Sequence, residues 1–200
     1  MHNVAVIGAG VIGLASAVNI QNKLPEAKVR IIADRFDQDT TSWGAGGIFR
    51  PTAKHLHGVD LKRIRKWLRD GWDFYSSLAT SEHAGESGMQ IVSGFILYKE
   101  EPEVSRIPFQ FKLLSHTHSF FGGSSTCKSQ EGGEIEQRKV SDLNEFVGTY
   151  DIVVNCTGLG SKDLIGDNSV YPVRGQLVRV RAPWIKKFVY TDDDTYIYPK

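Results

Sequence analysis

The sequence predicts an α/β fold with a parallel sheet, and three features of its 200 residues support this. An apolar segment at residues 4–7 leads straight into a G-x-G-x-x-G motif at residues 8–13. A second apolar segment at residues 29–33 follows one helix length later and ends at Asp34. A third, at residues 150–156, is almost continuously apolar, as strands inside parallel sheets are. A strand, a helix and a strand in this order form a βαβ unit.

The glycine motif is the fingerprint of a dinucleotide-binding turn, although by itself it also fits an ordinary strand–helix turn. Gly8 permits the tight turn, Gly10 lets the backbone approach a pyrophosphate, and Gly13 lets the helix pack on the strand. The start of the helix offers free N–H groups to the phosphates. Asp34 stands where an acid binds the ribose hydroxyls in such units. The sequence therefore predicts a Rossmann-like dinucleotide site.

The other elements follow in order along the chain. The first helix is expected to end before Pro25, and residues 37–54 are expected to form a loop. Residues 59–80 carry apolar side chains three and four apart, which predicts a helix with a core-facing seam. The seam consists of Leu61, Ile64, Leu68, Trp72 and Tyr75.

The second half is patterned less regularly. Residues 89–98 predict a strand pair or a bent strand, whereas residues 105–133 show no clear pattern. Short strands are expected at residues 135–140 and, half-exposed, at residues 175–181, where apolar and basic residues alternate. Residues 195–200 predict a last, aromatic strand.

Composition restricts the class of protein but not its reaction. The chain is 40% hydrophobic and 24% charged, with a net charge of +1, so no basic field indicates nucleic acid or a membrane surface. The two cysteines and six histidines show no metal-site spacing. No apolar run reaches the roughly 18 residues of a bilayer span. Because no signal peptide is evident either, a cytoplasmic or organellar-matrix protein is expected, without metal, nucleic-acid or membrane partners.

Several blocks of the chain, in the right order, resemble the D-amino-acid oxidase family of flavoenzymes. They lie at residues 6–14, 33–36, 40–51, 92–94, 151–160, 172–176, 182–184 and 196–199. They include the segments VIGAGVIGL, ADRF, TTS, VSG, DIVVNCTGLG, PVRGQ, APW and YIYP. The stretch at residues 81–94 is more similar to the aspartate-type members than to those that act on neutral D-amino acids.

This resemblance implies a fold and a reaction. It implies a Rossmann-like FAD-binding domain at residues 1–54 and 134–170, interleaved with an incomplete mixed-sheet substrate domain at residues 55–133 and 171–200. It implies FAD-dependent oxidative deamination of acidic D-amino acids, D-aspartate above all, to a 2-oxo acid, ammonia and hydrogen peroxide. The partners are then a small D-amino acid and oxygen. Two alternatives stay open: an oxidase of neutral D-amino acids, and an inactive, truncated FAD-binding remnant.

The resemblance also assigns the cofactor contacts to particular residues. They are Gly8, Ala9, Gly10, Gly13, Asp34, Arg35, Thr40, Thr41, Ser42, Gly46, Gly47, Ile48, Val140, Thr157 and Gly158. The hydroxyl-rich loop, Thr40 to Ser42, would follow the pyrophosphate; a plain turn with a helix cap is the alternative. Arg35 is equally well a solvated side chain, and Val140 equally well an edge-strand valine.

Two residues are candidates for contact with the substrate. By resemblance, the Tyr196 hydroxyl meets the substrate carboxylate; a core aromatic is the alternative. Arg50 follows the flavin-facing glycines, and we infer that its guanidinium pairs with a side-chain carboxylate, against the alternative of a surface arginine.

Two segments found in family members are not present in these residues. The chain is short between Phe111 and Gly133, where relatives carry a further strand and helix. Relatives also continue past Pro199 with an arginine for the α-carboxylate, a glycine-rich segment that faces the flavin and often a peroxisomal tripeptide. The resemblance thus implies the peroxisomal matrix without a targeting signal in this sequence. For these 200 residues alone we expect weak FAD binding and no turnover.

Overall fold

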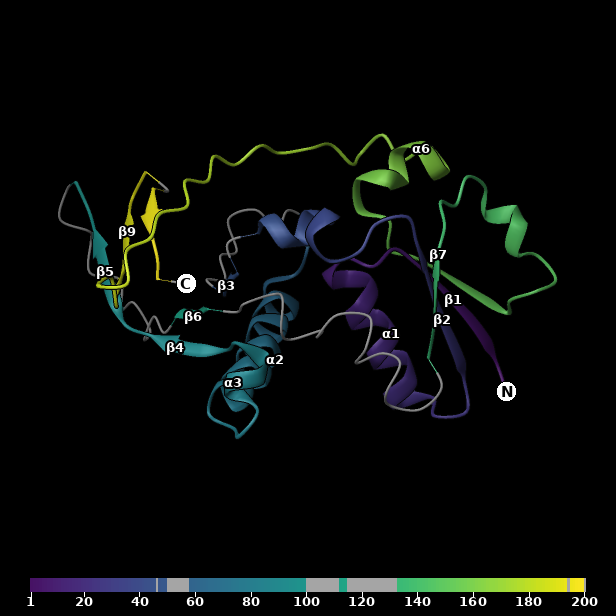
Figure 1. Ribbon diagram of the computed structural model, residues 1–200, viewed down its shortest axis with the longest axis horizontal. Coiled ribbons are helices and arrows are strands. Elements are labelled where there is room, and N and C mark those ends of the chain that lie inside the picture. Colours follow the sequence, from purple (N-terminus) through teal and green to yellow (C-terminus); the bar gives the residue numbers. More distant parts are fainter. Residues whose placement is uncertain (46, 50–57, 100–111, 115–132, 194, 200) are drawn as a thin grey trace. The chain divides into compact units, whose positions relative to one another are not determined.

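The computed structural model describes residues 1–45, 47–49, 58–99, 112–114, 133–193 and 195–199. The chain divides into two compact units (Figure 1). The first comprises Met1–Ala45 and Thr117–Gln176, and the second comprises Gly46–His116 and Leu177–Lys200. Each unit has its own sheets, and each is described by itself.

A parallel sheet of four described strands forms the centre of the first unit (Figure 1). Its strands are β1 (Asn3–Ile7), β2 (Lys28–Ala33), β7 (Glu134–Gln137) and β8 (Ile152–Asn155). Their order is β7-β2-β1-β8, and all three pairings are parallel. The predicted α/β fold is confirmed, although β8 lies at an edge of the described sheet and not inside it.

Helix α1 (Val11–Lys23) connects β1 to β2 and packs on one face of this sheet (Figure 1). Because side chains alternate along a strand, Val4 and Val6 of β1 point to the same face, where they join Ala17 of the helix in a buried cluster. The helix ends at Leu24, just before the proline that was predicted to stop it.

The other face of the sheet is covered by a short 3-10 turn, η3 (Leu143–Phe146). Phe146 is fully buried there against Ala5 and Ile7 of β1 and Ile32 of β2. Most of β1 and β2 is therefore buried on both faces, which explains why β1 from Val4 to Ile7 and β2 from Ile31 to Ala33 are continuously apolar.

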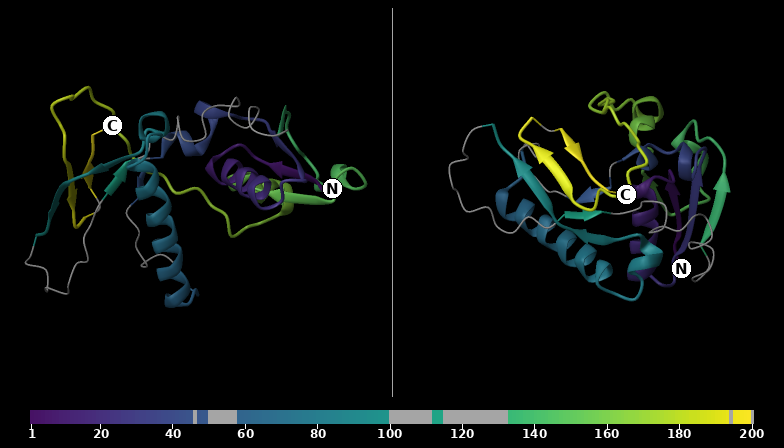
Figure 2. Two further views of the ribbon diagram at one scale, coloured as in Figure 1. Left: turned by 90° about the horizontal axis from the view of Figure 1, so that it is seen from below. Right: turned by 60° about the vertical axis from the view of Figure 1, so that its left-hand side comes forward.

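The second unit contains two small sheets. The strands β3 (Ile48–Phe49), β6 (Lys112–Leu114) and β4 (Gln90–Val92) form an antiparallel sheet in that order. The other sheet consists of β5 (Gly94–Leu97), β9 (Phe188–Thr191) and β10 (Tyr196–Ile197). In it β9 lies between β5, to which it is parallel, and β10, to which it is antiparallel (Figure 2).

Of the two predictions for residues 89–98, a strand pair or a bent strand, the structure has two strands, and they belong to different sheets. Ser93 separates them, and its carbonyl accepts a hydrogen bond from the N–H of Phe188 at 3.2 Å. A Cβ atom on Gly94 would lie 2.2 Å from the carbonyl oxygen of Phe188. The chain thus changes sheets at the point where only glycine allows β5 to approach β9.

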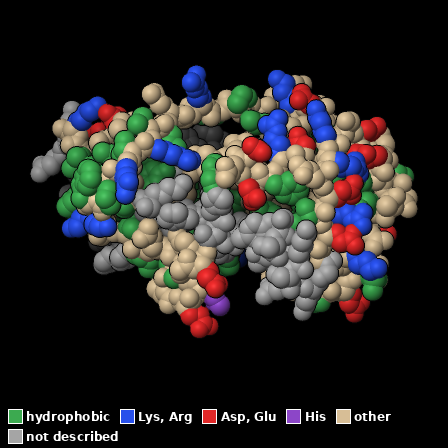
Figure 3. All heavy atoms as spheres, viewed as in Figure 1, with side chains coloured by type: hydrophobic (Ala, Val, Ile, Leu, Met, Phe, Trp, Pro, Cys, Tyr) green, Lys and Arg blue, Asp and Glu red, His purple; other side chains and the backbone are tan. Residues whose placement is uncertain are grey.

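Helix α2 (Leu61–Ala79) is confirmed and is followed by the short helix α3 (Ala84–Ser87). Of the predicted apolar seam, only Ile64 is fully buried, while Leu61 is 59% exposed. Hydrophobic side chains also lie on the outside of this unit around β5 and β9 (Figure 3), among them Phe95. Within the described residues, no helix has both the length and the apolar character needed to cross a membrane.

Two sequence predictions are wrong. Residues 175–181 form no strand, since no described strand pairs with them, and Val178 and Val180 are 73% and 74% exposed. The alternation of apolar and basic side chains along residues 175–181 is typical of an edge strand, but no described strand lies beside them to pair with. Residues 37–54 are more than a loop, because they contain the 3-10 turns η1 (Asp37–Asp39) and η2 (Thr41–Gly44) and the strand β3.

Candidate functional site

The carboxyl ends of the parallel strands meet at one edge of the sheet in the first unit. The residues that follow β1, β2, β7 and β8 are Gly8, Asp34, Arg138 and Cys156. The N–H of Gly8 donates to the carbonyl of Ile32 at 2.8 Å, and the N–H of Arg138 donates to that of Ala33 at 3.0 Å. These bonds extend the sheet beyond its strands. Open parallel sheets bind their ligands outside this edge.

Two of the three motif glycines are required by packing. Gly8 has a φ of +110°, and a Cβ atom there would lie 2.4 Å from the carbonyl oxygen of Cys156. A Cβ atom on Gly13 would lie 1.9 Å from the carbonyl oxygen of Gly8. The strand, the turn and α1 therefore contact one another through backbone atoms.

Gly10 differs from them, and it is the position that tests whether a dinucleotide fits. A Cβ atom on Gly10 would have only one heavy atom within 4 Å outside its chain neighbours, the hydroxyl oxygen of Ser42 at 3.2 Å. No backbone atom of the described protein requires a glycine here. A backbone left bare beside the start of α1 suits the close approach of a pyrophosphate, so the residues present fit a dinucleotide.

The hydroxyl-rich loop reaches the start of α1. The N–H of Val11 donates to the Ser42 hydroxyl oxygen at 2.9 Å, so an oxygen atom already occupies a position where a phosphate oxygen accepts. The Thr40 hydroxyl donates to the carbonyl of Asp37 at 2.8 Å, and Thr41 begins η2. Ser42 thus accepts a hydrogen bond from the first turn of α1, although the N-cap residue of that helix is Gly10.

A Ser42→Ala variant is expected to lower the free energy of unfolding by about 1 kcal/mol, because it leaves the Val11 N–H without its side-chain acceptor. Urea denaturation of the parent and the variant would measure the difference. A Thr40→Ala variant, which loses only a contact within its own turn, is the control. A Ser42 variant as stable as the parent would contradict this account of the loop.

Asp34 follows β2 as an exposed carboxylate. Its Oδ2 lies 3.7 Å from Nε of Arg35, and the side chains of Asp34 and Arg35 are 49% and 70% exposed. An ion pair this exposed contributes little to stability. Its carboxylate oxygens therefore remain available to accept hydrogen bonds from ribose hydroxyls.

A polar cluster shapes the turn after β8. Oδ1 of Asn155 accepts the Thr157 hydroxyl at 2.7 Å and the Thr157 N–H at 3.2 Å, and Thr157 and Ser161 share a further bond of 2.9 Å between their hydroxyl oxygens. Gly158 then adopts a φ of +56° and begins the 3-10 turn η4 (Gly158–Gly160), which leads into α6 (Ser161–Ile165). Thr157 and Gly158 are thus held in a defined turn at the ligand-binding edge. Asn155 and Ser161 were not predicted.

Ala9 and Val140 contribute packing on opposite faces of the sheet. Ala9 is buried in the cluster that includes α1, and Val140 packs on the cluster around Phe146. Their side chains are therefore accounted for by the core, and only their backbone atoms would be left for a cofactor.

The other predicted residues belong to the second unit. Gly47 has a φ of +67°, and Ile48 begins β3. Gly46 and Arg50 lie outside the described residues. Tyr196 lies in β10 and is 45% exposed, which rules out the alternative of a buried core aromatic.

Tyr196 is the middle ring of an aromatic stack. Its ring centroid lies 5.7 Å from that of Tyr190, with an interplanar angle of 2°, and 5.8 Å from that of Tyr198. Burial raises the pKa of Tyr198, and the proximity of Tyr196 adds to this rise. The two neighbouring rings fix the orientation of the Tyr196 ring, which suits a residue that presents its hydroxyl to a ligand.

Charged side chains line the surface of β2 and β7. On β2 and β7, acidic and basic side chains alternate at the surface (Figure 3) and form a connected chain that includes Arg138 and Glu136. Nowhere in the described parts of the chain do three His, Cys, Asp or Glu side chains gather as metal ligands do.

Comparison with known proteins places this geometry in context. A family described as FAD dependent oxidoreductase matches residues 3–118. D-aspartate oxidase of Homo sapiens is 34% identical, over 98% of this chain and 65% of the relative. D-amino acid oxidase of Dugesia ryukyuensis is also 34% identical, over 100% of this chain and 67% of the relative. The chain thus spans about two thirds of the length of these relatives.

A solved structure agrees in fold. Glycine oxidase from Geobacillus kaustophilus superimposes with a TM-score of 0.67, and the match covers 100% of this chain and 69% of that one. Since only 16% of the residues are identical, this likeness concerns the fold alone. It confirms the fold class that the sequence predicts.

Proposed function

Because this chain belongs to the family of FAD-dependent oxidoreductases that includes the D-amino-acid oxidases, we propose that it binds FAD and oxidises acidic D-amino acids. D-Aspartate would be the preferred substrate, with a 2-oxo acid, ammonia and hydrogen peroxide as products and oxygen as the second substrate. The observation that carries the proposal is the bare backbone at Gly10, which lies at the start of α1 on the carboxyl edge of the sheet.

The residues of the first unit would hold the nucleotide part of FAD. The free N–H groups at the start of α1 would donate to the pyrophosphate, and the Asp34 carboxylate would accept from the ribose hydroxyls. Thr157 and Gly158 would line the same edge. In this proposal residues 1–54 and 134–170 form the FAD-binding domain, and residues 55–133 and 171–200 form the substrate domain.

Residues of the second unit would meet the flavin and the substrate. Gly46, Gly47 and Ile48 would lie along the flavin ring, which, when bound, accepts a hydride from the substrate Cα. The Tyr196 hydroxyl would donate to the α-carboxylate, and its stacked ring would keep that hydroxyl in place. Arg50 would pair with the side-chain carboxylate of an acidic substrate. These contacts orient the substrate, which is the protein's main contribution to hydride transfer.

The test is a peroxide assay of a full-length, FAD-loaded version of this protein with D-aspartate, D-glutamate and D-alanine, because the 200 residues alone are expected to show no turnover. Faster oxidation of the two acidic substrates would support the proposal. Flavin absorbance of the purified protein is read beside it, so that a chain without cofactor is not scored as an inactive enzyme. A flavin-loaded protein that oxidises none of the three would overturn the proposed activity.

A second candidate is an oxidase of neutral D-amino acids. It is favoured by the relative from Dugesia ryukyuensis, whose identity of 34% equals that of the D-aspartate oxidase from Homo sapiens. Preference for D-alanine in the same assay would establish it.

The family resemblance further favours the peroxisomal matrix, where hydrogen peroxide is a normal product.

In a full-length version of this chain, an Arg50→Ala variant is expected to lower kcat/KM for D-aspartate by about 10- to 100-fold, because a charge-assisted hydrogen bond contributes roughly 1.5–3 kcal/mol. D-Alanine has no side-chain carboxylate, so its kcat/KM should change by less than about twofold. Steady-state kinetics with both substrates measures the difference, and Arg50→Lys, which keeps the charge but not the planar fork, should fall between. Equal losses for both substrates would remove Arg50 from substrate selection.

A further inference from the structure

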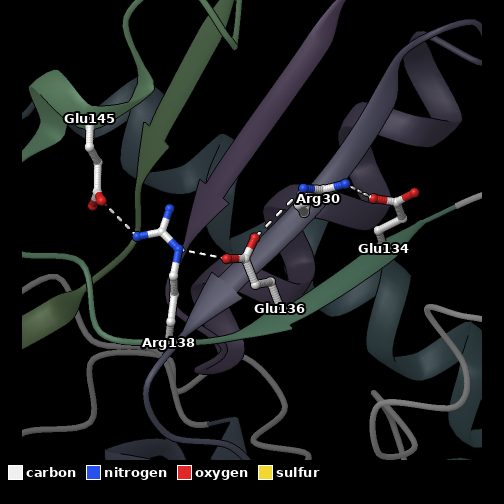
Figure 4. Close-up of polar contacts among 5 residues, drawn as sticks. All are labelled: Arg30, Glu134, Glu136, Arg138 and Glu145. Atoms are coloured by element: carbon white, nitrogen blue, oxygen red, sulfur yellow. Dashed lines mark hydrogen bonds and ion pairs between the residues drawn. The ribbon is translucent and has the colours of Figure 1, made fainter.

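Five charged side chains form a continuous chain across β2 and β7 (Figure 4). Arg30 of β2 contacts Glu134 of β7 and, at 3.6 Å, Glu136 of the same strand. Nε of Arg138 donates to Glu136 at 2.6 Å, and Nη1 of Arg138 donates to Glu145 at 2.7 Å. The chain thus continues from β2 across β7 to the turn η3.

The two arginines occupy different places in this chain. Arg30 pairs in register with Glu134, at the start of the β2–β7 pairing, whereas Ala33 and Gln137 pair at its carboxyl end. Arg138 is the first residue beyond that end. Arg138 is therefore the arginine next to the edge where the nucleotide is proposed to bind.

Arg138 is fixed through both its backbone and its side chain. Its N–H donates to the carbonyl of Ala33 at 3.0 Å, and its guanidinium carbon lies 5.3 Å from the ring centroid of Phe146. Burial acts to lower the pKa of Arg138, but hydrogen bonds to Glu136 and Glu145 more than compensate, and its pKa is raised. The Arg138 guanidinium is therefore positively charged at any pH at which the protein would be assayed.

The segment that Arg138 holds leads past Asp34. Gln137 pairs with Ala33, the residue before Asp34, and its Nε2 donates to the Asp34 carbonyl at 3.5 Å. Since β7 lies at an edge of the described sheet, it pairs with a neighbouring strand on one side only, and the last bond of that pairing comes from the Arg138 N–H. On the other side, the contacts of Arg138 with η3 tie the segment down.

We propose that Arg138 is a positioning residue for the adenosine end of the dinucleotide, because it holds the end of β7 against Ala33 and Asp34. The inference rests on the proposed binding of FAD. A segment already held in its binding conformation costs less free energy to order when the ligand arrives. If the ion pairs only stabilised the fold, the loss of either arginine would lower the melting temperature without a selective loss of nucleotide affinity, since exposed pairs contribute little to stability.

Arg138→Gln and Arg30→Gln make a matched pair of variants. Each removes one positive charge and contacts with two glutamates, but only Arg138 lies at the carboxyl edge. Binding of FAD to the full chain is measured by flavin fluorescence, and binding of ADP, which lacks the flavin, by competition. Melting temperatures of the ligand-free proteins report the structural contribution.

Arg138→Gln is expected to weaken both FAD and ADP by about tenfold, the effect of losing one well-placed polar interaction, while Arg30→Gln changes neither by more than about twofold. Both variants should stay folded, with Arg138→Gln melting at the lower temperature because it also loses the contact with the Phe146 ring. If Arg138→Gln does not fold, Glu145→Gln, with Glu134→Gln as its control, tests the same link to η3.

Equal changes in ADP affinity for the two arginine variants, or none for Arg138→Gln, would overturn the inference while leaving FAD binding intact. A weaker affinity for FAD with an unchanged affinity for ADP would overturn it too, because it would place the effect at the flavin end. A parent protein that binds neither FAD nor ADP would instead refute the proposed function, and the inference with it.

Discussion

A Gly10→Val variant is expected to fold normally and to lose FAD. Gly10 has a φ of −73° and a ψ of 178°, which any residue adopts, so valine introduces no backbone strain. The Cβ atom of the added side chain meets only the Ser42 hydroxyl oxygen within 4 Å, and the side chain fills the space proposed for the pyrophosphate. We expect FAD affinity to fall by about 100-fold or more, equivalent to about 2.7 kcal/mol.

Flavin absorbance of the purified protein and a fluorescence titration with FAD measure this loss. The melting temperature of the ligand-free variant, expected within a few degrees of the parent, shows that the fold survives. Gly10→Ala adds a single carbon 3.2 Å from the Ser42 hydroxyl and should give an intermediate affinity. If Gly10→Val copurifies with as much FAD as the parent, this turn does not bind the pyrophosphate.

The first unit could be predicted from sequence because its signals are local. The two strand segments, which end just before Gly8 and just before Asp34, are each a single short stretch of sequence. The helix between them is bounded by the glycine motif and by Pro25. In the second unit the decisive contacts are distant. The chain divides into β4 and β5 at Gly94 because Phe188 lies against it, and no local pattern near residue 94 reveals that contact. At residues 175–181 the alternating pattern predicted a strand, but no described strand pairs with these residues.

The same distinction applies to the candidate site. The motif glycines and Asp34 were found because their spacing along the chain is itself the signal. Arg138 was missed because its role depends on Glu145, which reaches it through the tertiary fold. One signal was available: Glu136 and Arg138 are two residues apart, so their side chains share a face of a strand. That pattern indicates an ion pair, but not its place beside the nucleotide.

A Gly13→Ala variant is expected to destabilise the fold itself, by about 3 kcal/mol. The new Cβ atom would lie 1.9 Å from the carbonyl oxygen of Gly8 and 2.8 Å from its carbonyl carbon. Both are backbone atoms of the tight turn, so α1 has to move away from β1 to relieve the contact. Alanine favours a helix over glycine by only about 1 kcal/mol, so the steric cost outweighs the gain in propensity.

Urea denaturation of the ligand-free protein measures this effect, and Gly44→Ala is the control because a Cβ atom there would have no heavy atom within 4 Å. The control should change the free energy of unfolding by less than about 0.5 kcal/mol. A Gly13→Ala protein as stable as the parent would show that α1 does not pack on the turn as described. Together, the Gly13→Ala and Gly10→Val variants separate the two requirements that the G-x-G-x-x-G motif combines, which are helix packing and access for a ligand. Gly13 is needed for the helix to reach the strand, and in the proposed site Gly10 is needed for the ligand to reach the helix.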